Sequence, residues 1–217
     1  MIIQVCGTSG SGKSTVLRSL LERSRAASEA ALDHEKWAVM TEGRRSPLGY
    51  RFCLVGCPRP IFVPGAYESP TGGCDTIKGV EPALEVVRER VTLGEDVVAE
   101  GLFIMNMTRC PALLCEVAVP WHLVHLDTPL DECFRRILAR RQAVGDVRED
   151  GVARPLTDVN RRNIRGNFVR ARNYCDRMRR LGATVTRCPT EGALDVIMGL
   201  LTGGGENGED ISGAALG

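Results

Sequence analysis

The chain has 217 residues, 43% of them hydrophobic, and a formal net charge of +1. A chain of this size can close one sizeable core, so we expect a single domain over residues 1–201. No apolar run approaches the roughly 20 residues that a membrane-spanning helix requires, and the nine cysteines contain no CxxC pair of the kind that binds zinc. With no targeting segment before the first apolar run, we expect a cytoplasmic protein with reduced thiols and no membrane partner.

The amino-terminal segment carries a well-defined motif. The apolar run at 2–6 predicts a buried strand, and Gly-Thr-Ser-Gly-Ser-Gly-Lys-Ser follows it directly at 7–14. In this Walker A pattern, glycines bring backbone N–H groups against phosphate oxygens, the lysine contacts the outer phosphates and the serine hydroxyl ligates Mg²⁺. We therefore expect ATP and Mg²⁺ as cofactors, Lys13 as a catalytic cation and Ser14 as a metal ligand. The residues expected to hold the nucleotide are Gly7, Thr8, Ser9, Gly10, Ser11, Gly12, Lys13, Ser14 and Thr15.

The next segments predict a helix and an irregular hairpin. Apolar residues three and four apart indicate a helix from Ser14 to about Arg25. Residues 45–64 indicate a β-hairpin with strands near 50–55 and 61–63, because glycine and prolines mark a turn between them. The segments that follow are an irregular stretch at 67–79, a helix at 80–93 and a short buried strand at 96–99.

The second half of the chain continues this alternation. Residues 106–116 predict only a weak helix, because Pro111 interrupts them. A buried strand at 122–126 leads into a helix that we expect Thr128 to cap, with Pro129 in its first turn. The remaining predicted elements are a polar loop at 142–155, a long helix at 157–181, a strand at 183–187, a helix at 193–201 and a disordered acidic tail at 202–217.

Nearly apolar strands that alternate with helices indicate a parallel sheet covered on both faces. We predict an α/β fold of the P-loop NTPase type, similar to nucleoside and nucleotide kinases, with three α/β/α layers and a mainly parallel five-stranded sheet. The hairpin is predicted to be a small insertion, and residues at about 140–156 an arginine-rich lid. Ligands of such folds lie at the carboxyl ends of the strands, so the residues that follow each strand are the site candidates.

Two carboxylates stand at such positions. Glu100 ends the apolar run of its strand, and we predict that it holds Mg²⁺ or takes a proton from an attacking hydroxyl. The alternative is a carboxylate that only hydrogen-bonds the phosphate loop. Asp75 follows the paired glycines Gly72 and Gly73, which indicate either a close approach to a ligand or a tight turn. We predict that Gly73 and Asp75 contact the substrate, and leave open whether Asp75 or Glu100 is the general base.

Arginines supply most of the positive charge. Arg136 and Arg140 lie one turn apart on the helix after Thr128, and we predict that both act as catalytic cations of a closing lid, because phosphoryl transfer requires positive charge near the equatorial oxygens. On the long helix, Arg161 and Arg165 are predicted to reach the substrate, and the other arginines form a ridge suited to a phosphate backbone. The alternative is a solvated basic helix face.

The motifs exclude several classes of phosphate-loop protein. A GTPase of the switch type requires an Asn-Lys-x-Asp motif that binds guanine, and none of Lys13, Lys36 and Lys78 lies in such a motif. Transporter and ring ATPases require a longer chain and further motifs. A small kinase fits the length and the lid, with an acceptor hydroxyl approaching the γ-phosphate in line while Lys13 and the lid arginines stabilise the moving charge.

Four segments together resemble small P-loop kinases of tailed bacteriophages, akin to thymidylate and nucleoside kinases. These segments are GTSGSGKST, VPGAYESPTGGCDTIKG, VVAEGLF and LDTPLDECFRRILARR. Some members of this group phosphorylate 5-hydroxymethyluracil in phage DNA, a step towards hypermodified thymines that resist host nucleases. The resemblance spans about residues 1–190, and GGCDTI is its specific part. It implies ATP at 7–15, a substrate role around Tyr67 and Asp75, and lid arginines among Arg136, Arg140 and Arg141, with Arg141 on the nucleotide.

The motifs and the resemblance lead to one expected function, with alternatives left open. The expected function is an ATP-dependent kinase that acts on 5-hydroxymethyluracil in DNA, so that DNA is a partner. The first alternative is a kinase of a free deoxynucleoside or deoxynucleoside monophosphate. The second is a non-catalytic ATP-binding subunit of a DNA-modification or packaging complex. The sequence leaves the oligomeric state open.

Overall fold

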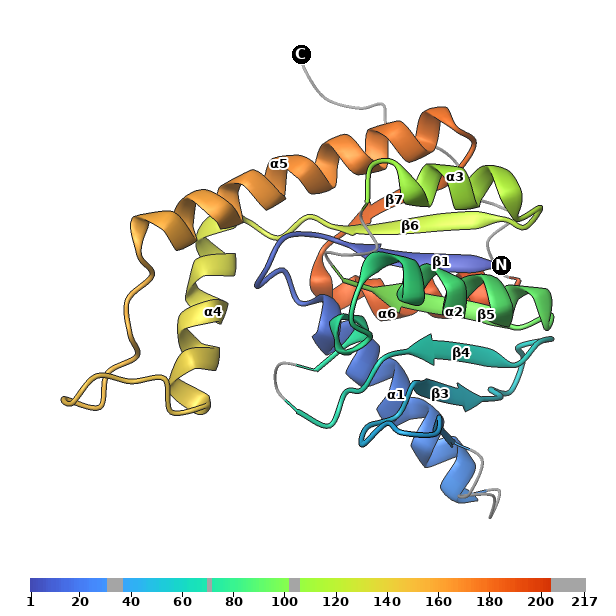
Figure 1. The fold of residues 1–217 in the computed structure, drawn as a ribbon, viewed down its shortest axis with the longest axis horizontal. Helices are drawn as coiled ribbons and strands as arrows, with labels where there is room; N and C mark the ends of the chain where they lie inside the picture. Colours follow the sequence, from blue (N-terminus) through green and yellow to red (C-terminus); the bar gives the residue numbers. More distant parts are fainter. Residues whose placement is uncertain (31–36, 70–71, 102–105, 204–217) are drawn as a thin grey trace.

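A computed structural model describes residues 1–30, 37–69, 72–101 and 106–203 (Figure 1). Its seven-stranded sheet has the order β2-β3-β4-β5-β1-β6-β7. Five neighbouring strands, from β4 to β7 in that order, run parallel, which confirms the predicted P-loop type of α/β fold. Residues 204–217, most of the predicted tail, lie outside the described residues. The strands are β1 (Ile2–Cys6), β2 (Ala38–Val39), β3 (Gly49–Phe52), β4 (Ile61–Pro64), β5 (Asp96–Glu100), β6 (Trp121–Leu126) and β7 (Thr184–Cys188).

The predicted hairpin is part of the main sheet and not an insertion. β3 and β4 pair antiparallel, as expected, but β4 also pairs in parallel with β5, where Ile61 lies beside Asp96. β2 then adds a second antiparallel strand at the edge. The expected count of five strands is therefore wrong, because antiparallel pairing extends the parallel sheet to seven strands. The residues of β4 are all buried, which explains their unbroken apolar pattern.

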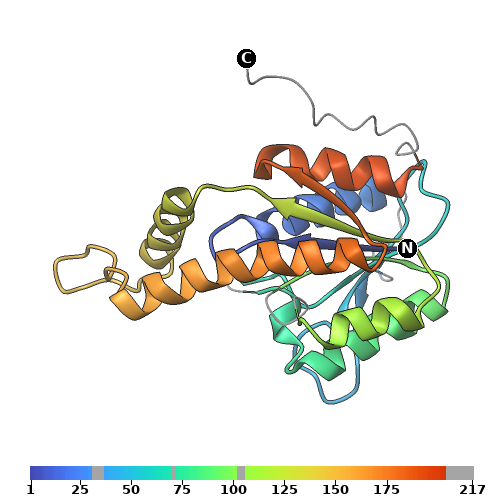
Figure 2. The same cartoon turned by 90° about the horizontal axis from the view of Figure 1, so that it is seen from above.

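The helices form two layers on the sheet. Side chains alternate along β1, so that Ile2 and Cys6 face one core and Ile3 and Val5 face the other. Helices α2, α3 and α5 cover the first core and α1 and α6 the second, as the view from above shows (Figure 2). The helices are α1 (Lys13–Ala30), α2 (Val80–Thr92), α3 (Arg109–Glu116), α4 (Leu130–Ala143), α5 (Asp158–Arg180) and α6 (Ala193–Leu201), with short 3₁₀ turns η1 (Cys74–Thr76) and η2 (Thr190–Gly192).

Two helix predictions need correction, one in the length of the helix and one in the effect of a proline. Helix α1 continues to Ala30, beyond the predicted end near Arg25. Pro111 does not break α3, because it lies in the first turn, where its missing N–H has no partner within the helix. None of the helices in the described part of the chain combines the length and low polarity needed to cross a bilayer.

Helix α4, the loop at 144–157 and the first half of α5 project beyond the carboxyl ends of the central strands (Figures 1 and 2). We call residues 130–180 the arm. The loop contains a single bridge between Val147 and Ala153. Helix α5 starts with a capping box, in which the Thr157 hydroxyl accepts from the backbone N–H of Asn160 and the Asn160 side chain accepts from that of Thr157. The predicted lid is thus an ordered connection between two helices.

A buried polar network on β1 holds the layers together. The side-chain oxygen of Gln4 accepts hydrogen bonds from Trp121 Nε1 on β6, at 3.2 Å, and from the Tyr174 hydroxyl on α5, at 2.7 Å. Gln4 and Tyr174 are both fully shielded from solvent. The hydroxyl of Tyr174 therefore ties the arm helix to the central strand.

We predict that Gln4→Leu lowers the free energy of unfolding by about 2 kcal/mol, because it leaves two buried donors without this acceptor. Urea denaturation measures the loss. Tyr174→Phe is the matched control, since it removes one donor and leaves Gln4 paired with Trp121, so its loss should be smaller. Equal stability of Gln4→Leu and the wild type would contradict the importance of this network.

Candidate active site

The phosphate loop lies between β1 and α1 and packs directly on the arm. Gly10 has a φ of +81°, and a Cβ there would lie 2.4 Å from the carbonyl oxygen of Cys133 on α4, so only glycine fits. The Thr8 hydroxyl donates to the carbonyl oxygen of Ile164 on α5, at 2.9 Å. Both arm helices therefore contact the loop that we expect to hold the nucleotide.

A second set of contacts supports the loop at Ser11. Its carbonyl oxygen accepts from the hydroxyls of Thr128, at 3.0 Å, and Thr190, at 2.9 Å. The prediction that Thr128 caps α4 is wrong: Pro129 occupies the N-cap position, and the Thr128 hydroxyl supports the phosphate loop instead. Arg136 reaches the same place, since its Nη1 donates to Thr190 Oγ1 at 3.1 Å and its Nε to Glu132 at 2.6 Å.

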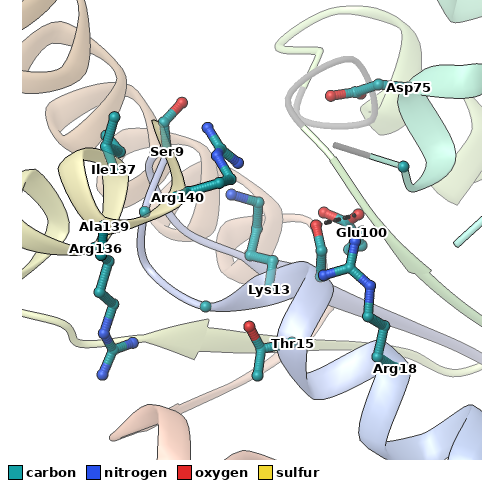
Figure 3. A pocket seen from close by; sticks show the side chains of 14 residues that line it. Ser9, Lys13, Thr15, Arg18, Asp75, Glu100, Arg136, Ile137, Ala139 and Arg140 are labelled. Carbon is teal, nitrogen blue, oxygen red and sulfur yellow. Dashed lines mark hydrogen bonds between the residues drawn. The ribbon is translucent and has the colours of Figure 1, made fainter. Parts of the chain in front are cut away.

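A cavity of about 520 Å³ opens between the phosphate loop, α4 and the segment at 72–75. It brings together most of the predicted nucleotide and catalytic residues (Figure 3). Gly7, Thr8 and Ser11 do not line it, so their predicted contacts with the nucleotide remain predictions. The lining residues are Ser9, Gly10, Gly12, Lys13, Ser14, Thr15, Arg18, Gly72, Asp75, Glu100, Arg136, Ile137, Ala139 and Arg140.

Lys13 and Glu100 are two opposite charges buried at the base of this cavity. Lys13 is 8% exposed and donates to the carbonyl oxygen of Thr8 at 2.9 Å. Burial lowers the pKa of its ammonium group, and the negative charges of Glu100 and Asp75 oppose this shift. Glu100 is 4% exposed. Burial raises the pKa of its carboxyl group, while Lys13 and the hydrogen bond from Ser14 oppose the rise.

One oxygen of Glu100 has several neighbours. Glu100 Oε1 accepts from the Ser14 hydroxyl at 3.0 Å and from the Tyr67 hydroxyl at 3.5 Å. A Cβ on Gly73, whose φ is +145°, would lie 2.3 Å from the same oxygen. Tyr67 is buried, and burial raises the pKa of its hydroxyl well above the ordinary value. The structure thus places Tyr67 and Gly73 against Glu100 and outside the cavity lining, and their predicted substrate contacts remain predictions.

The paired glycines of this segment have a packing reason that the sequence did not reveal. A Cβ on Gly72 would lie 2.3 Å from the carbonyl oxygen of Ala66, just as one on Gly73 would collide with Glu100. The chain folds back on itself here, since the N–H of Gly73 donates to the same carbonyl at 2.6 Å. Both glycines therefore have a packing reason within the folded chain, while Gly72 also lines the cavity and its close approach to a ligand remains a prediction.

Asp75 differs from Glu100 in its exposure. It lies in η1, is exposed to solvent, and faces the cavity from the wall opposite to α4 (Figure 3). A Cβ on Gly101 would lie 2.8 Å from Asp75 Oδ1, so the carboxylate lies close to the end of β5. One cavity therefore contains a buried carboxylate beside Ser14 and an accessible one near the end of β5.

Arg18 is a cavity residue that the sequence interpretation missed. Its guanidinium donates to the carbonyl oxygens of Ser69, at 2.7 Å, and Tyr67, at 3.4 Å, and so ties α1 to the segment after β4. The sequence spacing could have indicated this position, because Arg18 lies four residues after Ser14 and therefore on the same face of the helix.

The predicted arginines occupy different environments. Arg140 extends from α4 into the cavity on the side of Lys13, whereas the guanidinium of Arg136 points away from Lys13 (Figure 3). Arg141 does not line the cavity: it donates to the carbonyl oxygens of Arg154, at 3.0 Å, and Pro155, at 3.1 Å, and to Asn160. On α5, Arg161 lies over the ring of Phe134, at 5.3 Å, and Arg165 is exposed. Neither lines the cavity, so the roles assigned to Arg136, Arg141, Arg161 and Arg165 remain predictions.

The cavity offers two oxygen ligands suited to Mg²⁺. Among the described residues, no cluster of three or more His, Cys, Asp and Glu side chains could hold a metal by itself. Mg²⁺ in phosphate-loop proteins uses one or two side-chain oxygens, together with water and phosphate oxygens. The Ser14 hydroxyl and the Glu100 carboxylate, which lie 3.0 Å apart, fit this requirement.

Comparisons with known proteins agree with this geometry. Residues 2–163 match a family model described as an AAA domain. The chain belongs to this family. A protein of Pseudomonas phage PaMx11, named 5-hmdU DNA kinase, is 32% identical to it over 200 residues, which are 92% of this chain and 96% of the phage protein. The resemblance to phage P-loop kinases is therefore confirmed, and it extends beyond the phosphate loop to nearly the whole chain.

We predict that Glu100→Gln is more stable than the wild type at neutral pH. Because the folded-state pKa of Glu100 is raised, the wild type loses stability as pH rises from the unfolded pKa of about 4.3 through the folded value. The amide keeps an acceptor for Ser14 without the buried charge. Urea denaturation at pH 4 and pH 7 checks this: the advantage of the variant should appear at pH 7 and vanish at pH 4. An advantage independent of pH would show that the charge is not its cause.

Proposed function

We propose that this protein is an ATP-dependent kinase that phosphorylates 5-hydroxymethyluracil in DNA. The observation that carries the proposal is the single cavity that joins Lys13 and Ser14 of the phosphate loop to Asp75 on the opposite wall. A phosphoryl donor and a hydroxyl acceptor must meet in such a space to react in line. The name of the phage relative, which aligns over nearly its full length, supports the acceptor.

The proposed transfer moves the γ-phosphoryl group of ATP to the acceptor hydroxyl. The bond from the γ-phosphorus to the β–γ bridging oxygen breaks, and a bond from this phosphorus to the acceptor oxygen forms. Lys13 and Arg140, two of the cations that line the cavity, stabilise the charge that shifts to the bridging and equatorial oxygens. Mg²⁺, held by Ser14 and Glu100, would neutralise charge on the phosphate oxygens.

We assign Asp75 as the general base and Glu100 to the metal side. Glu100 is buried, and its Oε1 already accepts from Ser14 and Tyr67, so an acceptor hydroxyl has poor access to it. Asp75 is exposed and lines the same cavity. A base must come within hydrogen-bond reach of the hydroxyl whose proton it takes, and Asp75 satisfies this condition better.

The charge distribution supports a polymeric acceptor. The arm, residues 130–180, carries 14 arginines against seven acidic residues, a formal charge of +7, whereas the whole chain carries +1. The rest of the chain therefore has an excess of acidic residues. A positive arm, part of which lies next to the cavity, suits the binding of a nucleic-acid backbone, while a free nucleoside has no use for it.

The proposal is tested by incubating the protein with γ-labelled ATP, Mg²⁺ and each of several acceptors. The acceptors are duplex DNA with 5-hydroxymethyluracil, the same duplex with thymine, and the free nucleoside and monophosphate. We expect label only on the hydroxymethylated DNA. Label on the small molecules would favour the alternative of a nucleoside or nucleotide kinase. Retained ATP binding without transfer to any acceptor would favour a non-catalytic ATP-binding subunit.

We predict that Lys13→Ala lowers kcat/KM by about 10³-fold or more, because it removes positive charge from the transferring phosphoryl group. Steady-state transfer to hydroxymethylated DNA measures the effect. A near-wild-type rate in this variant would contradict the proposed use of the phosphate loop.

For Asp75→Asn we expect a fall in kcat of roughly 10²-fold with little change in the KM for ATP, since an amide cannot take the proton. Asp195→Asn, an exposed carboxylate on α6 outside the cavity, is the matched control and should keep the wild-type rate. An unchanged kcat in Asp75→Asn would contradict its assignment as the general base and favour Glu100 instead.

A further inference from the structure

A second cavity, of about 370 Å³, is lined by the residues that directly follow Asp75. Asp75 itself lines the cavity at the phosphate loop, and the three residues that follow it line the second cavity. From Asp75 to Lys78 the chain extends at most about 11 Å. The residues that line the second cavity are Arg44, Arg45, Ser46, Thr76, Ile77, Lys78 and Pro82.

Three cations face this small space. Arg44 is held in place, because its Nη2 donates to the carbonyl oxygens of Thr76 and Pro47, each at 3.4 Å, and so bridges two loops. Arg45 and Lys78 are exposed. In the described part of the chain, none of the ion pairs involves any of these three cations. Their charge is therefore not neutralised by a described carboxylate within 4.0 Å.

The position of this cluster is informative because the surrounding part of the chain is acidic on balance. The arm accounts for +7 of formal charge in a chain of +1, so the cations here are not part of a generally basic surface. Lys78 is also one of only three lysines in the chain, and another is Lys13. Three neighbouring cations without an acidic partner among the described residues favour an anionic ligand.

We propose that this second cavity binds a backbone phosphate of the acceptor strand, next to the nucleotide whose base enters beside Asp75. The inference rests on the proposed function, since it requires an acceptor that reaches Asp75. A strand with one base at Asp75 carries its neighbouring phosphates one nucleotide away, within reach of the other side of the same short turn. Arg45 and Lys78 supply the charge, and Arg44 supports the turn.

This contact would distinguish DNA from small acceptors. The phosphodiester of a strand and the phosphate monoester of a mononucleotide are both phosphate anions, whereas a nucleoside has no phosphate group. We assign the cavity to the phosphodiester, because at most about 11 Å of chain separates Asp75 from Lys78, a span that the neighbouring nucleotide of a strand can bridge. Each phosphate contact in a strand also gives binding a salt dependence.

The test measures binding separately from transfer. Fluorescence anisotropy follows a labelled single-stranded oligonucleotide with one central 5-hydroxymethyluracil, bound to the wild type, to Arg45→Ala/Lys78→Ala and to Arg23→Ala. Arg23 is an exposed arginine of α1 that lines neither cavity, and it is the matched control. We expect the double variant to bind about tenfold more weakly. The slope of log K against log salt should become shallower by about 1.4, from two contacts at roughly 0.7 each. Arg23→Ala should match the wild type.

Two further measurements keep the result unambiguous. The single variant Lys78→Arg, with Arg45 unchanged, keeps both positive charges and should bind the oligonucleotide like the wild type. This control separates an effect of lost charge from an effect of a distorted turn. Competition with 5-hydroxymethyldeoxyuridine and its monophosphate should show no difference between the wild type and the double variant.

Equal affinity and salt slope in the double variant, or an equal loss with the nucleoside or the monophosphate, would overturn the inference. The parallel transfer assay with labelled ATP separates this failure from failure of the proposed function. If the wild type transfers phosphate to hydroxymethylated DNA but the double variant keeps its affinity, only the phosphate site is wrong. If the wild type transfers nothing, the kinase assignment fails, and the anisotropy still decides whether the cavity binds a strand.

Discussion

The active site depends on a buried pair of opposite charges. β1 and β5 are neighbouring parallel strands whose register places Val5 beside Glu100, so the phosphate loop starts next to the carboxylate that ends β5. Lys13 and Glu100 are both buried there, and the charge of each offsets part of the desolvation cost of the other. Ser14, Tyr67 and Gly73 all contact or closely approach one oxygen of Glu100. Loss of that carboxylate would therefore alter the nucleotide side and the acceptor side together.

The phosphate loop and the arm form one connected unit. The loop contacts α4 at Gly10, and Thr8 hydrogen-bonds it to α5. The carbonyl oxygen of Ser11 accepts hydrogen bonds from Thr128, just before α4, and from Thr190 in η2. Arg136 joins α4 to the same contacts. A displacement of either arm helix would therefore also shift the loop that is expected to bind the phosphates. Arg140 in the cavity and the exposed arginines of α5 belong to the same arm.

Much of the fold and the centre of the site followed from the sequence. Unbroken apolar strands between amphipathic helices implied the parallel sheet, and the Walker A residues implied the nucleotide loop, because both are local patterns with few structural solutions. Features that depend on distant partners were harder to predict. The role of Arg18 was missed, Thr128 was taken for a helix cap, and the hairpin was taken for an insertion, because each depends on a partner far away in the chain: Ser69, Ser11 and β5 respectively.

The sequence by itself determined the layered α/β class, the phosphate loop and the kinase family, since these are encoded in residue types at short spacing. Only the tertiary structure decided which side chains share the cavity. Asp75 and Glu100 lie 25 positions apart in the chain, and only folding brings both to one cavity while burying one and exposing the other. Solvent access, and with it the chemical role of each carboxylate, is a property of the packed chain and not of the residue.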